Sequence, residues 1–251
     1  MRFLVFDTAG KVGGVLLAQV DAETRGQSET GVFRELAPRQ FSTDLIPAVA
    51  ALLRDHSCRL QDVDVLAVIA GPGSFTGLRV GLSAVKGFAE ALSKPVVAVS
   101  RLAVMASIPS LDERDASIPV HAVLDAGRGE FYHGVYREGG LECLGESART
   151  LEELSSELAR VPGQIVASEQ PVMAALQGFL PREISPVGAR HALPLVLRSW
   201  QAGRVSDVLK LDVNYLRASE AEIIARLAMH RQRKTTSRHV IADGRSDESA
   251  N

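Results

Sequence analysis

The chain has 251 residues, of which 46% are hydrophobic and 23% charged, so it can bury the core of one large domain or two small ones. Its formal net charge of −2 excludes a protein whose whole surface binds nucleic acid through basic residues. Cys58 and Cys143 form no CxxC pair, so neither a disulfide framework nor a zinc ribbon is indicated. With no apolar run long enough to span a membrane and no signal peptide, we expect a cytoplasmic protein.

The first hundred residues predict strands and helices in the order βββαβαβ. The opening strand ends in a turn at Asp7. The remaining strands are expected over 12–20, 30–36, 63–70 and 95–99, and the helices over 42–53 and from the glycine-rich segment to about residue 93.

The same opening recurs in the second half of the chain. A strand over 120–125 again ends in an aspartate, Asp125, and a hairpin, a helix over 151–158 and a strand over 164–167 follow. Two such halves are typical of the α/β actin-like ATPase fold of sugar kinases and Hsp70, in which each of two lobes is a ribonuclease-H-like unit. We therefore expect an N-terminal lobe at 1–105 and a second, smaller lobe at 106–217.

Beyond Pro181 the pattern weakens. A helix is predicted over 192–200 with Pro194 in its first turn, and an extended segment over 211–216. We expect a C-terminal helix at 218–230 and a disordered tail at 231–251, where large aliphatic residues are nearly absent. Basic residues near the end of that helix either complement its dipole or contact RNA phosphates. They are Arg226, Arg231, Arg233, Lys234 and Arg238.

The segment GPGSFTGLRVGLSAVKGFA at 71–89 is the most distinctive part of the chain. A glycine inside a helix costs about 0.8–1 kcal/mol relative to alanine. The presence of Gly77, Gly81 and Gly87 in one predicted helix therefore indicates that something approaches the helix backbone closely. The segment fits no P-loop, dinucleotide fingerprint or nucleophile elbow. Because Gly77, Gly81 and Ala84 share one helix face, they allow close packing on the protein's own sheet or on a partner. A third possibility is a nucleotide phosphate at the helix N-terminus.

Asp7 and Asp125 also allow two interpretations. Carboxylates at strand ends hold hydrated magnesium in actin-fold ATPases, and glycine-rich hairpins follow at 10–14 and 127–129. Alternatively, each carboxylate caps its turn, and the first hairpin lacks the Thr/Ser-rich phosphate clamp of such enzymes. His121 and His133 lie on predicted strands and could meet across a hairpin, but the histidine spacing indicates no metal site, and we expect no cofactor.

Residues 70–89 closely resemble the hallmark segment of the TsaB (YeaZ) family, bacterial accessory subunits for making N6-threonylcarbamoyladenosine in tRNA. Three further segments are similar to the family pattern: LVFDT at 4–8, LDAGRGEFY at 124–132 and NYLR at 214–217. The resemblance spans roughly residues 2–230. A minor departure is Val213 where the family usually has proline.

The resemblance implies a non-catalytic paralogue of TsaD, the subunit that transfers the threonylcarbamoyl group to A37 of ANN-decoding tRNAs. TsaD-type proteins carry a metal-binding HxxxH motif, and this chain has none. It implies a heterodimer with TsaD, which the ATPase TsaE joins, a homodimer when TsaD is absent, and contact with tRNA mainly through the complex. The expected partner interface comprises Ser74, Phe75, Thr76, Gly77, Arg79, Val80, Gly81, Ala84 and Val85.

Two other functions stay open: a stand-alone actin-fold ATPase or sugar kinase, and a metallopeptidase-like enzyme. Tight ATP binding with turnover by the isolated chain would favour the first, and stoichiometric bound metal the second.

Overall fold

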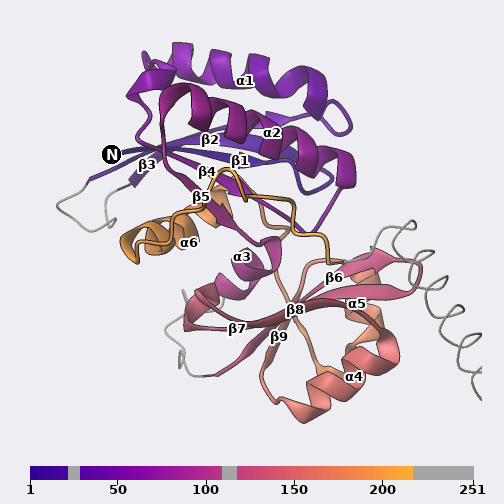
Figure 1. The fold of residues 1–251 in the computed structure, drawn as a ribbon. Helices are drawn as coiled ribbons and strands as arrows, with labels where there is room; N and C mark the ends of the chain where they lie inside the picture. The colour runs from indigo at the N-terminus through magenta and orange to yellow at the C-terminus, as the bar shows by residue number, and fades with distance from the viewer. Residues whose placement is uncertain (22–28, 109–117, 217–251) are drawn as a thin grey trace, which may run out of the picture. The chain divides into compact units, whose positions relative to one another are not determined.

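Two five-stranded mixed sheets organise the chain (Figure 1). The computed structural model describes residues 1–21, 29–108 and 118–216. The predicted helix at 218–230 and the tail at 231–251 lie outside these residues, as does the basic run.

The first lobe consists of β1 (Arg2–Asp7), β2 (Gly13–Val20), β3 (Glu29–Leu36), α1 (Phe41–Asp55), β4 (Val65–Ile69), α2 (Phe75–Leu92), β5 (Val96–Val99) and α3 (Arg101–Ser107), with a 3-10 turn at Leu60–Asp62. Its sheet has the order β3-β2-β1-β4-β5, in which β1, β4 and β5 are parallel and the hairpin strands antiparallel. Every residue of β4 is buried, which explains its uninterrupted apolar sequence.

The second lobe repeats this order with β6 (Val120–Gly127), β7 (Glu130–Arg137), β8 (Glu142–Thr150), α4 (Leu151–Arg160), β9 (Gln164–Ala167), α5 (Gln170–Ala175), β10 (Arg182–Glu183) and α6 (Ala189–Gln201). Short 3-10 turns lie at Glu138–Gly140 and Gln177–Phe179. The sheet order β8-β7-β6-β9-β10 matches that of the first lobe strand for strand. The predicted duplication of a βββαβαβ unit is therefore confirmed.

The last helix of each lobe packs against the other lobe's sheet. Helix α3 contacts β6 and β7, whereas α6 contacts β1, β2 and β5, so both helices lie between the sheets (Figure 1). One large apolar cluster consequently runs from the first lobe into the second, and a smaller one lies beneath α4 and α5. Helices α3 and α5 and strand β10 were not predicted from the sequence. Pro194 lies inside α6, after its first turn, so that expectation was wrong.

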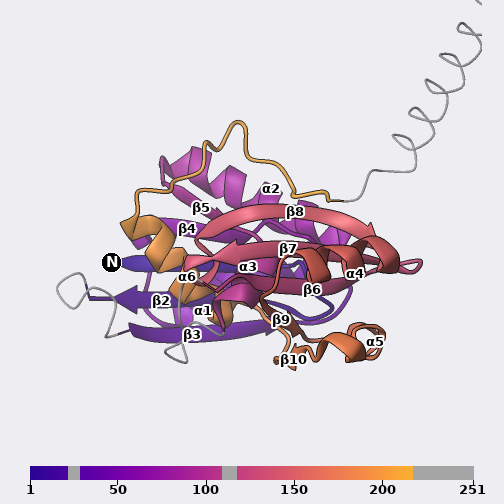
Figure 2. The same cartoon turned by 90° about the horizontal axis from the view of Figure 1, so that it is seen from below.

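Residues 203–216, here called the strap, return from α6 along the first lobe and lie beside α2 (Figure 2). The Lys86 Nζ on α2 donates a hydrogen bond of 2.9 Å to the carbonyl of Leu211, and the amide of Asn214 donates one of 2.9 Å to the carbonyl of Ala70. The C-terminal part of the strap, 211–216, for which the sequence predicts an extended segment, has no regular secondary structure.

Candidate functional site

The glycine-rich segment connects β4 to α2 and holds the start of that helix against the turn after β1. The Ser74 side chain caps α2 by accepting from the amide of Gly77 at 3.3 Å. The Ser74 amide donates to the carbonyl of Ala9 at 2.9 Å. The loop, the helix start and the β1 turn therefore form one hydrogen-bonded unit.

Gly77 and Gly81 face the inside of the first lobe. A Cβ atom on either glycine would lie closer than 3.0 Å to Thr8, and the Thr8 hydroxyl donates a hydrogen bond of 2.6 Å to the carbonyl of Gly77. The expectation that these glycines present a small-residue face to a partner is wrong, because the face packs on the protein's own β1 turn. Val85 is also fully buried, and Ala84 is half-buried against the core. Val80 is half-buried as well.

The exposed side of the same helix start carries the other predicted interface residues. Ser74, Phe75, Thr76 and Arg79 are exposed, and 52% of the Phe75 surface is accessible. The Arg79 guanidinium lies 3.9 Å from the centre of the Phe75 ring, and its Nε donates to the Tyr215 hydroxyl at 2.9 Å. We call Phe75, Arg79 and Tyr215 the aromatic–arginine patch. Tyr215 was missed as a site residue, although its NYLR motif was visible in the sequence.

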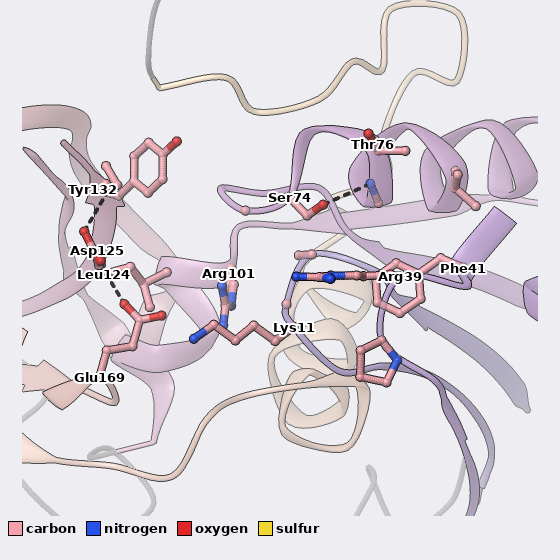
Figure 3. A pocket seen from close by; sticks show the side chains of 18 of the residues that line it. Lys11, Arg39, Phe41, Ser74, Thr76, Arg101, Leu124, Asp125, Tyr132 and Glu169 are labelled. Atoms are coloured by element: carbon pink, nitrogen blue, oxygen red, sulfur yellow. Dashed lines mark hydrogen bonds between the residues drawn. The ribbon is translucent and has the colours of Figure 1, made fainter. Parts of the chain in front are cut away.

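A cavity of about 1070 Å³ opens between the lobes (Figure 3). The first lobe contributes the β1–β2 turn, the loop before α1, the start of α2 and Arg101 at the start of α3, and the second contributes the end of β6 and Glu169. A second cavity of about 660 Å³ shares Gly10, Lys11, Arg101 and Glu169 with the first and extends to the start of α6.

The two predicted strand-end aspartates lie on opposite lobes in similar turns. Asp7 Oδ1 accepts from the amide of Ala9 at 2.9 Å, and Asp125 Oδ1 accepts from the amide of Gly127 at 2.7 Å. Each carboxylate therefore caps its turn. Asp7 is only 2% exposed, and this burial raises its pKa to about 6, against the hydrogen bond from Ala9 and the charge of Arg101.

Asp125 is exposed instead, and it lines the cavity together with Glu169. The Glu169 Oε2 accepts from the amide of Asp125 at 2.7 Å, so the two carboxylates are held next to each other. Among the described residues, no three His, Cys, Asp or Glu side chains gather as a metal site would require.

The cavity is also lined by three basic residues, Lys11, Arg39 and Arg101. None of them was singled out as a site residue from the sequence. They come from three separate loops and helix starts, so no motif in the sequence connects them. All three belong to the first lobe, and their convergence depends on how the loops of that lobe fold together.

His121 and His133 meet across the β6–β7 hairpin, as the sequence allowed. The His121 Nδ1 and the His133 Nε2 are 2.9 Å apart, and the rings are stacked. Both are buried in the second lobe, and burial lowers the pKa of each.

The paired βββαβαβα lobes define the class: a two-lobed α/β protein with the actin-like, ribonuclease-H-like fold. The solved structure of YeaZ from Pseudomonas aeruginosa superposes with a TM-score of 0.66 at 25% identity, covering 86% of this chain and 99% of that one. Across the described residues, no helix is long and apolar enough to cross a membrane.

The family model described as "TsaD: tRNA N6-adenosine threonylcarbamoyltransferase" matches residues 15–240. The chain is 31% identical to TsaB of Haemophilus influenzae over 225 residues, which is 86% of this chain and 90% of that protein. It is 28% identical to TsaB of Escherichia coli over 232 residues, covering 88% and 96%. The chain belongs to the TsaB (YeaZ) family, paralogues of TsaD.

Proposed function

We propose that this chain acts in the biosynthesis of threonylcarbamoyladenosine in tRNA as a non-catalytic subunit that binds TsaD. TsaE joins through TsaD, and the chain contacts tRNA mainly within that complex. The relatives named tRNA threonylcarbamoyladenosine biosynthesis protein TsaB support the pathway. Without TsaD, the same surface forms a homodimer.

The aromatic–arginine patch is the observation that carries the TsaD contact. Aromatic residues and arginine supply most of the binding energy in protein interfaces, because they bury a large area with little loss of side-chain freedom. Phe75 and Tyr215 lie 5.3 Å apart between ring centres, and Arg79 bridges them. Their geometry is therefore fixed before a partner arrives, which lowers the entropic cost of binding. The buried packing of Gly77 and Gly81 fixes the helix that presents the patch.

The non-catalytic role is supported by the chemistry of the residues present. The sequence contains no HxxxH motif. Asp7 and Asp125, which an actin-fold ATPase would use to hold magnesium and water, each accept a hydrogen bond from their own turn, and Asp7 is buried. A stand-alone ATPase or kinase remains the alternative, and ATP turnover by the purified chain would favour it.

The decisive experiment measures TsaD binding by calorimetry with the Phe75→Ala/Arg79→Ala double variant. We expect Kd to rise at least about thirty-fold, since truncating hot-spot residues costs about 2 kcal/mol or more. The matched control is Leu144→Ala, which removes a 46% exposed apolar side chain from β8 in the second lobe and should leave Kd unchanged. Equal affinity of the double variant and the unchanged chain would exclude the patch as the contact.

Threonylcarbamoylation of tRNA, reconstituted from purified components, tests whether the chain is a non-catalytic subunit. Chain, TsaD, TsaE and threonylcarbamoyl-adenylate together should modify tRNA, whereas the chain without TsaD should not. The double variant should slow the complete reaction in proportion to the lost TsaD binding. Transfer by the chain alone, at the rate of the full set, would contradict a non-catalytic subunit.

A further inference from the structure

Asn214 belongs to the NYLR motif, but the aromatic–arginine patch does not explain it. It lies in the strap directly before Tyr215, and its side chain is half-buried. Its side-chain Nδ2 donates a hydrogen bond to Oε2 of Glu146, on β8 of the second lobe (Figure 2). Its backbone amide donates to the carbonyl of Ala70, in the first lobe, at 2.9 Å. Asn214 therefore joins the patch to both lobes at one point of the strap.

The Glu146 carboxylate is itself held in place by the second lobe. Its other oxygen, Oε1, accepts a hydrogen bond from the hydroxyl of Tyr136, whose side chain is fully buried. Glu146 is paired with Gly134 between β7 and β8, and the Tyr136 ring lies over that glycine, where an added Cβ atom would be 2.7 Å from a ring carbon. The absence of a side chain at Gly134 thus leaves room for the tyrosine to reach Glu146. The same hydroxyl lies 3.3 Å from Ser100 Oγ, which caps α3, so the carboxylate is held beside the contact between the lobes.

The end of the strap depends on such side-chain contacts. Residues 211–216 have no regular secondary structure, so no helix or sheet fixes the position of Tyr215. Among the described residues, the other hydrogen bonds that tie this stretch to a lobe come from the first lobe. One of them, from Arg79 to the Tyr215 hydroxyl, is exposed, and there water competes for both groups. Glu146 acts on the preceding residue from a half-buried position, where water competes less.

The pairing of a carboxylate with an amide is chemically specific. A carboxylate only accepts hydrogen bonds, so the residue at position 214 must supply a donor, and the asparagine amide does so. A hydrogen bond to an ionised oxygen is also stronger than one between neutral groups.

We propose that Glu146 is a positioning residue for the contact with TsaD. Through Asn214 it sets the place of Tyr215, so the second lobe takes part in a contact that α2 and the strap make. Ordering Tyr215 before the partner arrives lowers the entropic cost of binding. The identity of the partner rests on the proposed function, whereas the placement of Tyr215 is a property of the free protein.

Fluorine NMR of the free protein tests the placement. The full chain contains three tyrosines, Tyr132, Tyr136 and Tyr215, so labelling with fluorotyrosine gives three resonances, which single substitutions to phenylalanine assign. The Asn214→Ala variant should narrow the Tyr215 resonance and move it toward the shift of free fluorotyrosine, because the ring gains freedom. The Tyr132 resonance should stay unchanged. A Tyr215 resonance that is the same in Asn214→Ala as in the unchanged chain would overturn the proposal.

Calorimetry with TsaD tests the consequence for binding. Glu146→Ala and Asn214→Ala should each raise Kd about fivefold to tenfold, and the double variant should raise it no further, because the two residues act through one hydrogen bond. Losses that add in the double variant would show that Glu146 acts on TsaD by itself, which contradicts positioning through Asn214.

The matched control is Glu142→Ala, which removes the same charge from an exposed position on the same strand. Its Kd and its Tyr215 resonance should equal those of the unchanged chain. An equal rise of Kd in Glu142→Ala and Glu146→Ala would assign the effect to charge and overturn the proposal. Thermal melts check that each variant is folded, and Asn214→Ala keeps the buried contact of Tyr136 with Glu146 if Glu146→Ala does not fold.

Failure of this proposal can be told apart from failure of the proposed function. If Phe75→Ala/Arg79→Ala raises Kd while Glu146→Ala and Asn214→Ala leave it unchanged, the patch is the contact and the positioning role is wrong. If Phe75→Ala/Arg79→Ala leaves Kd unchanged, the proposed contact is wrong, and the Tyr215 resonance then decides whether Glu146 sets the place of that ring.

Discussion

The two lobes share one topology, yet they bury their equivalent parts to different degrees. Both sheets have the same strand order, and an aspartate at the end of β1 and another two residues before the end of β6 each cap their own turn. In the first lobe an 18-residue helix, α2, covers that turn, and Asp7 is 2% exposed. In the second lobe the equivalent helix, α5, has 6 residues, and Asp125 is exposed.

This difference shows that burial, rather than topology, decides what a repeated turn can do. The buried turn of the first lobe is fixed by Thr8 and Ala9 against the start of α2, so it presents a rigid helix and its patch. In the open turn of the second lobe, the Asp125 carboxylate faces the cleft while it caps the turn. One duplicated unit thus supplies a rigid support on one side and a polar wall on the other.

The largest effect should come from a substitution at Gly81, where α2 covers the first-lobe turn. Gly81→Arg should destabilise the protein by about 5 kcal/mol or more, because even a Cβ atom would collide with Thr8 and a buried charge adds to the cost. Urea denaturation followed by circular dichroism measures the loss.

Gly87→Arg is the matched control, because it places the same side chain on the same helix where nothing lies within 4 Å. Arginine favours helices more than glycine does, so stability should stay the same or rise by up to about 1 kcal/mol. If Gly81→Arg melted like Gly87→Arg, the tight packing of α2 on the β1 turn would be refuted.

Asp7→Asn should produce the next largest effect, seen as a change in pH dependence. The pKa of Asp7 is raised to about 6 in the folded protein against 3.8 in the unfolded chain. The contribution of Asp7 to folding stability is therefore fully present below pH 3.8 and is lost as the pH rises through 6. Between pH 4 and pH 7 the free energy of unfolding should fall by about 2–3 kcal/mol from this cause. Asparagine keeps the oxygen that accepts from Ala9, so the variant should gain stability relative to the unchanged chain as the pH rises.

Denaturant melts of the two proteins between pH 4 and pH 7 give this difference directly. Asp125→Asn alters the equivalent exposed turn, and there we expect a change below about 0.5 kcal/mol at every pH. A difference between Asp7→Asn and the unchanged chain that stays constant with pH would show that Asp7 is not buried as described.

The sequence predicted most of the duplicated fold, because each strand and long helix has its own apolar period. Thus β4 could be recognised as a buried strand, and the paired aspartates at 7 and 125 indicated the repeat. It did not predict α3, whose seven residues are too few for a clear helical period and whose burial comes from the other lobe. β10 has two residues and was invisible for the same reason.

The site was predicted less well, since its residues are close only in space. Phe75 and Arg79 lie in a recognisable segment, whereas Tyr215 reaches them through the strap from 136 residues beyond Arg79. The spacing of the glycines could not show whether their helix face packs inside the lobe or against a partner. A face of small residues allows close packing in either case. Lys11 follows β1 and Arg101 begins α3, so the two residues meet only once the first lobe has folded.

The smallest expected effect is a change in the stability of the second lobe with pH. Its sign is opposite to that of the Asp7 effect, because the second lobe loses stability as the pH falls. Burial is the main cause that lowers the pKa of both His121 and His133, and His133 reaches about 3, below its ordinary value of 6.5. Such a group stabilises the fold above pH 6.5, and this contribution is lost as the pH falls. At pH 5 this lost contribution from His133 should lower the free energy of unfolding by about 2 kcal/mol.

Hydrogen exchange measures where that loss falls, because the histidine pair lies on β6 and β7. Between pH 7 and pH 5, and after correction for the intrinsic rate, exchange should speed up more in β6 and β7 than in β1 and β4. A His121→Gln/His133→Gln variant should remove this selective acid sensitivity. Equal acceleration in both sheets of the unchanged chain would mean that the lobes open as a single unit and that the histidine pair does not set the acid limit of the second.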